Sequence, residues 1–328
     1  MDDTAHRALL RRASSDVWVR NMLQGRNKLA RWLPVQSGGG EVEAAGYRFL
    51  YDEEDGGDTL LCISRPPVRA TCFRVWFDRE AQQISLDVSY HARCAQNKEL
   101  AKGDGTVAML SAIVKVVLAR PDIASYRCMV VTDNSTIEVP DGGGEPLKLP
   151  LMDVFFMCTG CTWYSSLAPM FLRDAGVDAQ YREDRDKRGQ CTWDAFIDRL
   201  PSRVAAVVEA HIEFGEAATR LLPAVSILER IRAGRTHAFL FHYTPDFLAA
   251  LGVRSLRGTE WVLPLQDGDV PVPTGDDLAS CRHPTRGWVV PADRIKAVSA
   301  AEYDRIKRYI QTSARAVVGA ASVSVVRM

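Results

Sequence analysis

Two cysteines stand three positions apart in the segment CTGCTWYSS. Cys158 and Cys161 form a Cys-x-x-Cys pair that is followed directly by Thr-Trp-Tyr. Such a pair can supply two ligands of a structural zinc site or form a redox dithiol, and it also fits two small apolar residues at the start of a helix. The chain has no second Cys-x-x-Cys and no closely spaced His pair near these cysteines. We therefore expect structural thiols and no metal, with a redox role as the alternative.

A glycine turn, KGDGT, precedes an apolar segment with helical periodicity at residues 107–119. A strand that runs into such a turn and then into a helix aims main-chain N–H groups at one point, where the helix dipole favours an anion. Gly103 and Gly105 carry no Cβ, so the main chain can approach the anion closely. Lys98 and Lys102 would add positive charge. The turn therefore predicts a phosphate or pyrophosphate site, with an ordinary helix start as the alternative.

The segments on both sides of the turn predict a mixed order of strands and helices. Short strands are expected at residues 47–51 and 60–64. The segments TCFRVWF and ISLDVSYHA alternate apolar and polar residues across the polar DREAQQ, which is typical of a hairpin. After the helix, SYRCMVVT predicts one more strand. The turn lacks the third glycine of a dinucleotide fingerprint and the G-K-[ST] of a P-loop.

The remaining segments carry weaker local signals. We expect helices at residues 4–34 and 151–175, with Gly176 as the helix C-cap. Further helices are expected between residues 192 and 234 and at 300–318. The other expectations are strands at HAFLFHY and TEWVLPL, and loops at EVPDGGGEPLKLP, YREDRDKRGQ and DGDVPVPTGDD.

The composition bounds the class of protein. The 328 residues suit two domains or one domain with large additions, and 47% hydrophobic with 25% charged residues is ordinary for a soluble globular protein. A net charge of zero gives no reason to expect nucleic acid. No apolar run approaches the roughly 18–20 residues that cross a bilayer, and the N-terminal residues do not resemble a signal peptide. We expect a cytoplasmic protein whose eight cysteines are reduced thiols.

The turn and the order of elements resemble the GNAT-type acyl-CoA N-acyltransferases. Their turn carries Q/R-x-x-G-x-G/A, and the segment LAKGDG matches both glycines, with Leu100 in place of Gln or Arg. The next strand ends in TDNST, and a later segment contains TWY, a pairing that also resembles uncharacterised GNAT-like proteins of large DNA viruses. The resemblance covers residues 45–185. It implies an α/β (α+β) fold with a mixed, mostly antiparallel sheet flanked by helices, followed by an additional C-terminal α+β region.

The resemblance also implies a cofactor, an acceptor and roles for single residues. The cofactor would be acetyl-CoA (coenzyme A) and the acceptor an amine. Tyr164 would protonate the leaving thiolate, and His91 or Asp133 would act as general base, with a packed core tyrosine as the alternative for Tyr164. The residues expected at the coenzyme are Lys98, Lys102, Gly103, Asp104, Gly105, Thr106 and Asn134.

These expectations divide the chain into three parts. Residues 1–40 would be an N-terminal helical segment, and residues 41–190 the GNAT-like acyl-CoA-binding domain. Residues 191–328 would be an α+β region that is either a degenerate second GNAT-like half or an interaction module. The expected function is N-acetyl transfer by direct attack of the amine. The alternative is a catalytically inactive GNAT-like scaffold with a structural or interaction role, including a viral one.

Overall fold

The chain is an α+β protein whose strands are mostly antiparallel and are flanked by helices. The computed structural model describes residues 41–44, 47–54, 57–63, 71–88, 104–132, 136–139, 147–212, 222–234, 237–275, 281 and 287–323. The helix predicted at residues 4–34 lies outside these ranges. The chain forms two compact units, residues 1–121 and 122–328. The division predicted at residues 40 and 190 stays a prediction.

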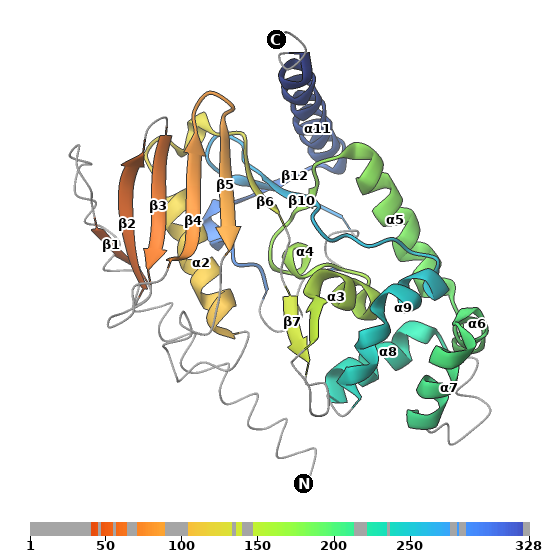
Figure 1. The fold of residues 1–328 in the computed structure, drawn as a ribbon. Helices are drawn as coiled ribbons and strands as arrows, with labels where there is room; N and C mark the ends of the chain where they lie inside the picture. Colours follow the sequence, from red (N-terminus) through yellow and green to blue (C-terminus); the bar gives the residue numbers. More distant parts are fainter. Residues whose placement is uncertain are drawn as a thin grey trace. The chain divides into compact units, whose positions relative to one another are not determined.

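The first unit is an antiparallel meander followed by one helix (Figure 1). Its described residues form five strands, and each of the first four pairs antiparallel with the next. The hairpin predicted from the alternation of apolar and polar residues is confirmed, as are the two short strands before it and the helix after it. The elements are β1 (Glu41–Ala44), β2 (Tyr47–Glu54), β3 (Gly57–Ile63), β4 (Thr71–Asp78), β5 (Gln83–Val88) and α2 (Asp104–Leu118).

The β4–β5 hairpin buries one face and exposes the other. Val75 lies opposite Leu86 and Phe77 opposite Ile84, and all four side chains are buried. Trp76, between them in sequence, points to the other face and is 44% exposed. Period-two alternation produces this result because successive side chains of a strand point to opposite faces.

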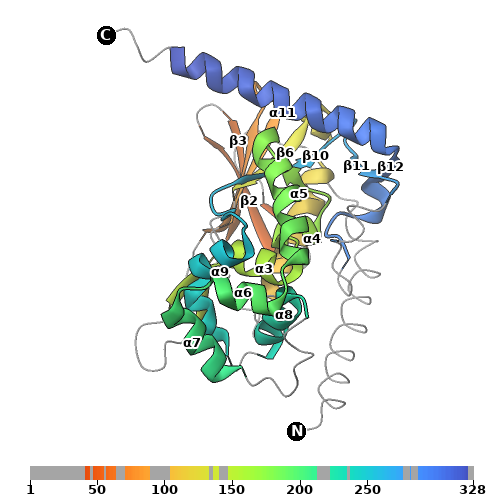
Figure 2. The same ribbon diagram turned by 90° about the vertical axis from the view of Figure 1, so that its right-hand side faces the viewer.

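The second unit contains a three-stranded antiparallel sheet made from distant parts of the chain. β6 (Cys128–Thr132) pairs with β10 (Glu260–Pro264), which pairs on its other side with β9 (Phe171–Leu172). The strands predicted at SYRCMVVT and TEWVLPL are confirmed as β6 and β10. Beside them, the helix α11 (Ala300–Val323) contacts β10 and β11 (Val270–Pro273), and Figure 2 shows it along its whole length.

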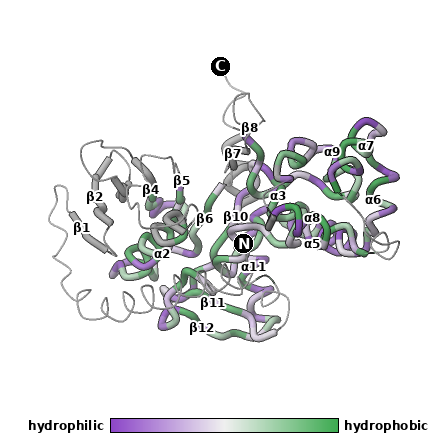
Figure 3. The backbone as a smooth tube through the Cα atoms, turned by 90° about the horizontal axis from the view of Figure 1, so that it is seen from below, coloured by the Kyte–Doolittle hydropathy of each residue, from purple (hydrophilic) through white to green (hydrophobic). Residues whose placement is uncertain are grey.

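Helices make up most of the rest of the second unit. In Figure 3 their tubes change between purple and green along their length, the pattern of amphipathic helices. Trp193, Phe196 and Phe247 are buried and form ring contacts at 5.2 and 5.3 Å, which joins two of these helices. The elements are α3 (Leu151–Thr159), α4 (Trp163–Leu167), α5 (Ala175–Gln190), α6 (Trp193–Arg199), α7 (Ser202–His211), α8 (Ala224–Gly234), α9 (Thr244–Leu251) and the 3₁₀ segments Ile123–Ser125, Ala238–Tyr243 and Ala292–Arg294.

The prediction of a single helix at residues 151–175 is wrong. The segment forms two short helices, α3 and α4, followed by β9. Gly160 ends α3 in the left-handed region at φ 77°, where a residue with a Cβ would be strained. Thr162 then starts α4 through a reciprocal capping box with Ser165. Gly176 is not a helix C-cap, because it lies in the first turn of α5, where its N–H donates to Asp174 at 2.7 Å.

The charged segment YREDRDKRGQ is not a loop but most of α5. Its charges pair along the helix, since Lys187 lies 2.8 Å from Glu183 and Arg182 lies 3.4 Å from Asp178, both at i, i+4 spacing. Glu, Lys and Arg are good helix formers, so a dense run of charge is compatible with a helix. High charge alone therefore does not predict a loop.

Three further segments differ from the predictions. HAFLFHY forms the 3₁₀ segment Ala238–Tyr243 instead of a strand, because a short continuous apolar run fits either structure. The predicted loop EVPDGGGEPLKLP includes the end of β7 (Thr136–Val139) and all of β8 (Leu147–Pro150), which pair as an antiparallel hairpin. The predicted loop DGDVPVPTGDD contains β11, which pairs in parallel with β12 (Ile295–Val298).

Candidate functional site

Of the residues predicted at the coenzyme, the structure describes Asp104, Gly105 and Thr106 at the start of α2. Lys98, Lys102, Gly103 and Asn134 lie outside the described residues, as do the predicted bases His91 and Asp133. The main chain of Asp104, Gly105 and Thr106 forms the first turn of α2, a helix of 15 residues. The first N–H groups of a helix have no carbonyl partner within it, so they remain available to an anion or a cap. The predicted turn and the helix start therefore coincide.

Tyr164, the predicted proton donor, lies in α4 and is buried, with 3% of its surface exposed. The rings of Tyr164 and Trp163 pack edge to face, with their centres 5.0 Å apart. Thr162, the N-cap of this short helix, and Ser165 hydrogen-bond to each other in its capping box. This burial agrees with the alternative interpretation of Tyr164 as a packed core tyrosine.

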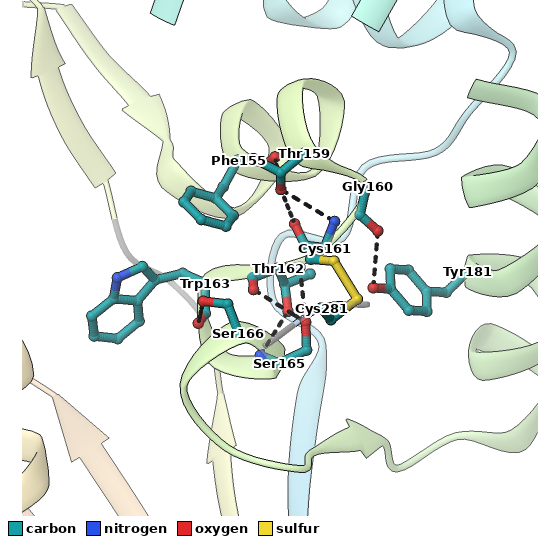
Figure 4. The surroundings of a disulfide bond; sticks show 10 residues. All are labelled: Phe155, Thr159, Gly160, Cys161, Thr162, Trp163, Ser165, Ser166, Tyr181 and Cys281. Atoms are coloured by element: carbon teal, nitrogen blue, oxygen red, sulfur yellow. Dashed lines mark hydrogen bonds between the residues drawn. A yellow bond between two sulfur atoms is a disulfide. The ribbon is translucent and has the colours of Figure 1, made fainter. Parts of the chain in front are cut away.

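The two cysteines of the Cys-x-x-Cys pair have different partners. Cys161 forms a disulfide with Cys281, 120 residues later, with the Cα atoms 5.6 Å apart. Figure 4 shows this bond between the corner that follows α3 and the segment that contains Cys281. Cys158 is a buried free thiol whose Sγ donates to the carbonyl of Leu228 at 3.6 Å. The expectation of reduced thiols is wrong for Cys161 and Cys281, because the fold brings them within bonding distance.

Cys158 is expected to resist iodoacetamide in the native protein at mildly alkaline pH. Burial is the largest cause that raises its pKa from 9.0 to about 12, and only the thiolate reacts. Because folding raises the pKa of Cys158, its neutral thiol stabilises the folded state. This stabilisation is complete below pH 9 and is lost as the pH rises towards 12.

Mass spectrometry after alkylation, with and without concentrated urea, measures this difference. Cys158 should be modified only in the urea sample. Equal labelling of Cys158 in both samples would restore the redox interpretation of the Cys-x-x-Cys pair.

The second unit contains a cavity of about 260 Å³ that the sequence did not predict. Among the described residues, four aromatic rings line it in two edge-to-face pairs. Tyr181 packs against Trp261 with the ring centres 5.5 Å apart, and Phe171 packs against Tyr303 at 6.2 Å. The disulfide cysteine Cys281 also lines the cavity.

Two helices supply the charged residues of this cavity. Asp178, Arg182 and Arg185 on α5 follow one another at i, i+4 and i+7, so they share one face of the helix. Asp304 and Lys307 on α11 line the same cavity at i, i+3 spacing. This helical spacing is the sequence signal that could have revealed the site, and it was missed because α5 was expected to be a loop.

A buried ion pair joins the two helices beside the cavity. Lys307 Nζ donates to Asp178 Oδ2, and both side chains are less than a tenth exposed. The other oxygen of Asp178 accepts the main-chain N–H of Leu172 at 3.2 Å. Burial is the largest cause that lowers the pKa of Lys307 below its usual value, and Asp178 opposes that effect. The pair holds α11 against α5 and β9.

Comparison of the chain with protein-family models, with curated proteins and with solved structures finds no match. Within the described residues, no group of three or more His, Cys, Asp or Glu could hold a metal ion. In the same part of the chain, no helix combines the length and apolar content that a membrane span needs. The candidate sites therefore rest on their own geometry.

Proposed function

We propose that the chain is an N-acyltransferase that moves an acetyl group from acetyl-CoA to an amine. The observation that carries the proposal is that α2 begins at Asp104, inside the turn that contains Gly103 and Gly105. The antiparallel hairpin β4–β5 precedes this helix in the chain and β6 follows it, which is the order of elements that the sequence resemblance implies. Support comes from this order and from the glycine spacing together.

The residues at the helix start fit a pyrophosphate in three respects. The N–H groups of Gly105 and Thr106 belong to the first turn, whose donors have no partner within the helix. The glycines leave the main chain without a Cβ at two positions, and a helix of this length has a dipole that favours an anion at its N-terminus. Lys98, Lys102 and Asn134 are the side chains proposed to complete the coenzyme site.

The chain's own residues have two further proposed roles. Bound acetyl-CoA would supply the thioester. His91 or Asp133 would keep the acceptor amine neutral, and the hydroxyl of Tyr164 would donate the proton that the departing group needs. Direct attack by the amine requires no covalent enzyme intermediate, so no catalytic triad is part of the proposal.

Isothermal titration with acetyl-CoA and with free coenzyme A tests the proposal. We expect a Kd on the order of micromolar for the wild-type protein and no measurable binding to Gly105→Glu, because the new carboxylate would occupy the anion position and repel the pyrophosphate. Ala119→Glu is the matched control, since it adds the same charge at an exposed position directly after the far end of the same helix. Binding to this control should be unchanged.

An inactive scaffold is the second candidate. Two observations favour it: Leu100 stands where the family pattern has Gln or Arg, and the side chain of Tyr164 is buried. No heat with either ligand, from a protein whose thermal unfolding is cooperative, would contradict the transferase and support the scaffold. Equal binding to wild type and Gly105→Glu would place any coenzyme elsewhere.

A further inference from the structure

The cavity of the second unit has apolar walls and a surplus of hydrogen-bond donors. The described residues that line it include three cations, Arg182, Arg185 and Lys307, and two carboxylates, Asp178 and Asp304, so they carry an excess of one positive charge. The hydrogen bonds and ion pairs that each polar group already makes decide which groups can bind a ligand.

The tyrosine hydroxyls of the cavity are already engaged by the main chain. Tyr181 donates to the carbonyl of Gly160 at 3.3 Å, and Tyr303 donates to that of Pro169 at 3.0 Å. Burial is the largest cause that raises the pKa of both tyrosines, so they stay protonated and carry no charge near neutral pH. Their rings therefore contribute apolar wall and not polar recognition.

The carboxylate of Asp178 is also saturated. It accepts the N–H of Leu172 on one oxygen, and Lys307 and Arg182 share the other. Only Nε of Arg182 makes this contact, at 3.4 Å, and half of the arginine side chain is exposed. Asp304 is exposed at the first turns of α11, where water solvates its charge.

Among the described residues that line the cavity, Arg185 has the most donors to spare. Its half-buried side chain forms no ion pair or hydrogen bond with any residue that the structure describes. A guanidinium presents five N–H donors and no acceptor, so its natural partner is an anion. On the same face of α5, Arg182 lies one turn away and can contribute further donors.

The volume and the walls limit the size and shape of the ligand. A cavity of about 260 Å³ lies at or below the lower end of the range for drug-sized ligands, which begins at about 300 Å³. Two edge-to-face aromatic pairs line it, and aromatic side chains pack well against another flat ring. A single planar ring with one acidic group fits both limits.

We propose that this cavity binds a small organic anion with one planar apolar ring, whose acidic group pairs with Arg185 while the ring packs among Tyr181, Trp261 and Tyr303. The site belongs to the second unit and does not depend on the proposed coenzyme site. Arg182 supports the same acidic group from the neighbouring turn of α5. The ion pair between Asp178 and Lys307 keeps the two helices in place around the ligand.

Fluorine NMR titration with 4-fluorobenzoate and with the neutral 4-fluorobenzyl alcohol tests the proposal. We expect the benzoate to bind the wild-type protein at least about tenfold more tightly than the alcohol, because a charge-assisted pair with Arg185 is available to it alone. Arg185→Gln should remove this preference by weakening benzoate at least about tenfold, with the affinity for the alcohol unchanged.

Two further variants make the result specific to the cavity. Lys187→Gln is the matched control, because it removes one positive charge from the same helix at a residue that pairs with Glu183 and does not line the cavity. It should bind benzoate like the wild type. Ala300→Trp places a large ring at an exposed position of the cavity wall and should block both ligands.

Three results would overturn the proposal: no binding of either probe, equal affinity for the acid and the alcohol, or undiminished benzoate binding to Arg185→Gln. The comparison of the two probes uses only the wild-type protein, so it decides the question even if a variant fails to fold.

Discussion

Replacing Lys307 with methionine is expected to lower the free energy of unfolding of the second unit by about 3 kcal/mol. The substitution leaves the carboxylate of Asp178 buried without its closest cation. Removal of one partner of a buried pair costs about 3–5 kcal/mol, and the lower value applies here because Arg182 remains 3.4 Å from the same oxygen. Urea denaturation followed by circular dichroism measures the change.

A surface lysine and a double variant make this measurement specific. Lys296→Met removes an equally charged residue that is 45% exposed and 4.0 Å from Asp267, so it should cost less than about 1 kcal/mol. Lys307→Met combined with Asp178→Leu should be more stable than Lys307→Met alone, because no buried charge is then left unpaired and the exposed Arg182 is solvated by water. A loss below about 1 kcal/mol for the single variant would show that water reaches Asp178 and that the pair is not buried in solution.

Reduction of the disulfide between Cys161 and Cys281 is expected to cost up to about 4–5 kcal/mol of stability. The bond closes a loop of 120 residues, and in the chain-entropy description a longer closed loop restricts the unfolded chain more. The loop contains α5 to α9, so its release also frees much of the second unit. Urea unfolding with and without dithiothreitol measures the loss.

Peptide mapping without reductant should recover Cys161 and Cys281 in one linked pair. Cys281→Ser should match the reduced wild type, and reductant should not destabilise this variant further. Cys191→Ser is the control, since Cys191 is a free buried thiol. Superimposable unfolding curves with and without reductant, or recovery of the two cysteines in separate peptides, would contradict the prediction.

Local patterns predicted the elements whose signal lies within one short segment. The alternation in β4 and β5 predicted a hairpin, because a strand turns every second side chain to the same face, and the structure pairs Val75 with Leu86 and Phe77 with Ile84 on the buried face. The helical periodicity of residues 107–119 predicted α2, and that of residues 300–318 predicted most of α11. These segments form what their own residues favour, so no distant contact was needed to identify them.

The predictions for other segments were wrong where the same local signal fits two different structures. The charge of YREDRDKRGQ fits both a solvated loop and a helix with i, i+4 ion pairs, and the chain forms the helix α5. The apolar run HAFLFHY fits a strand or a buried helical turn, and the chain forms the 3₁₀ segment Ala238–Tyr243, which contacts α8 and β8. Local propensity is too weak to separate such alternatives.

The sequence by itself determined the β4–β5 hairpin of the first unit, the helix that follows the KGDGT segment and most of α11. Tertiary structure alone decided that Cys161 pairs with Cys281 and not with Cys158, because a disulfide needs two Cα atoms about 5–6 Å apart and no local pattern encodes that distance. It likewise decided the cavity, whose rings and charges come from β9, α5, β10 and α11. Lys307 and Asp178 stand 129 residues apart, and only the folded chain makes them partners.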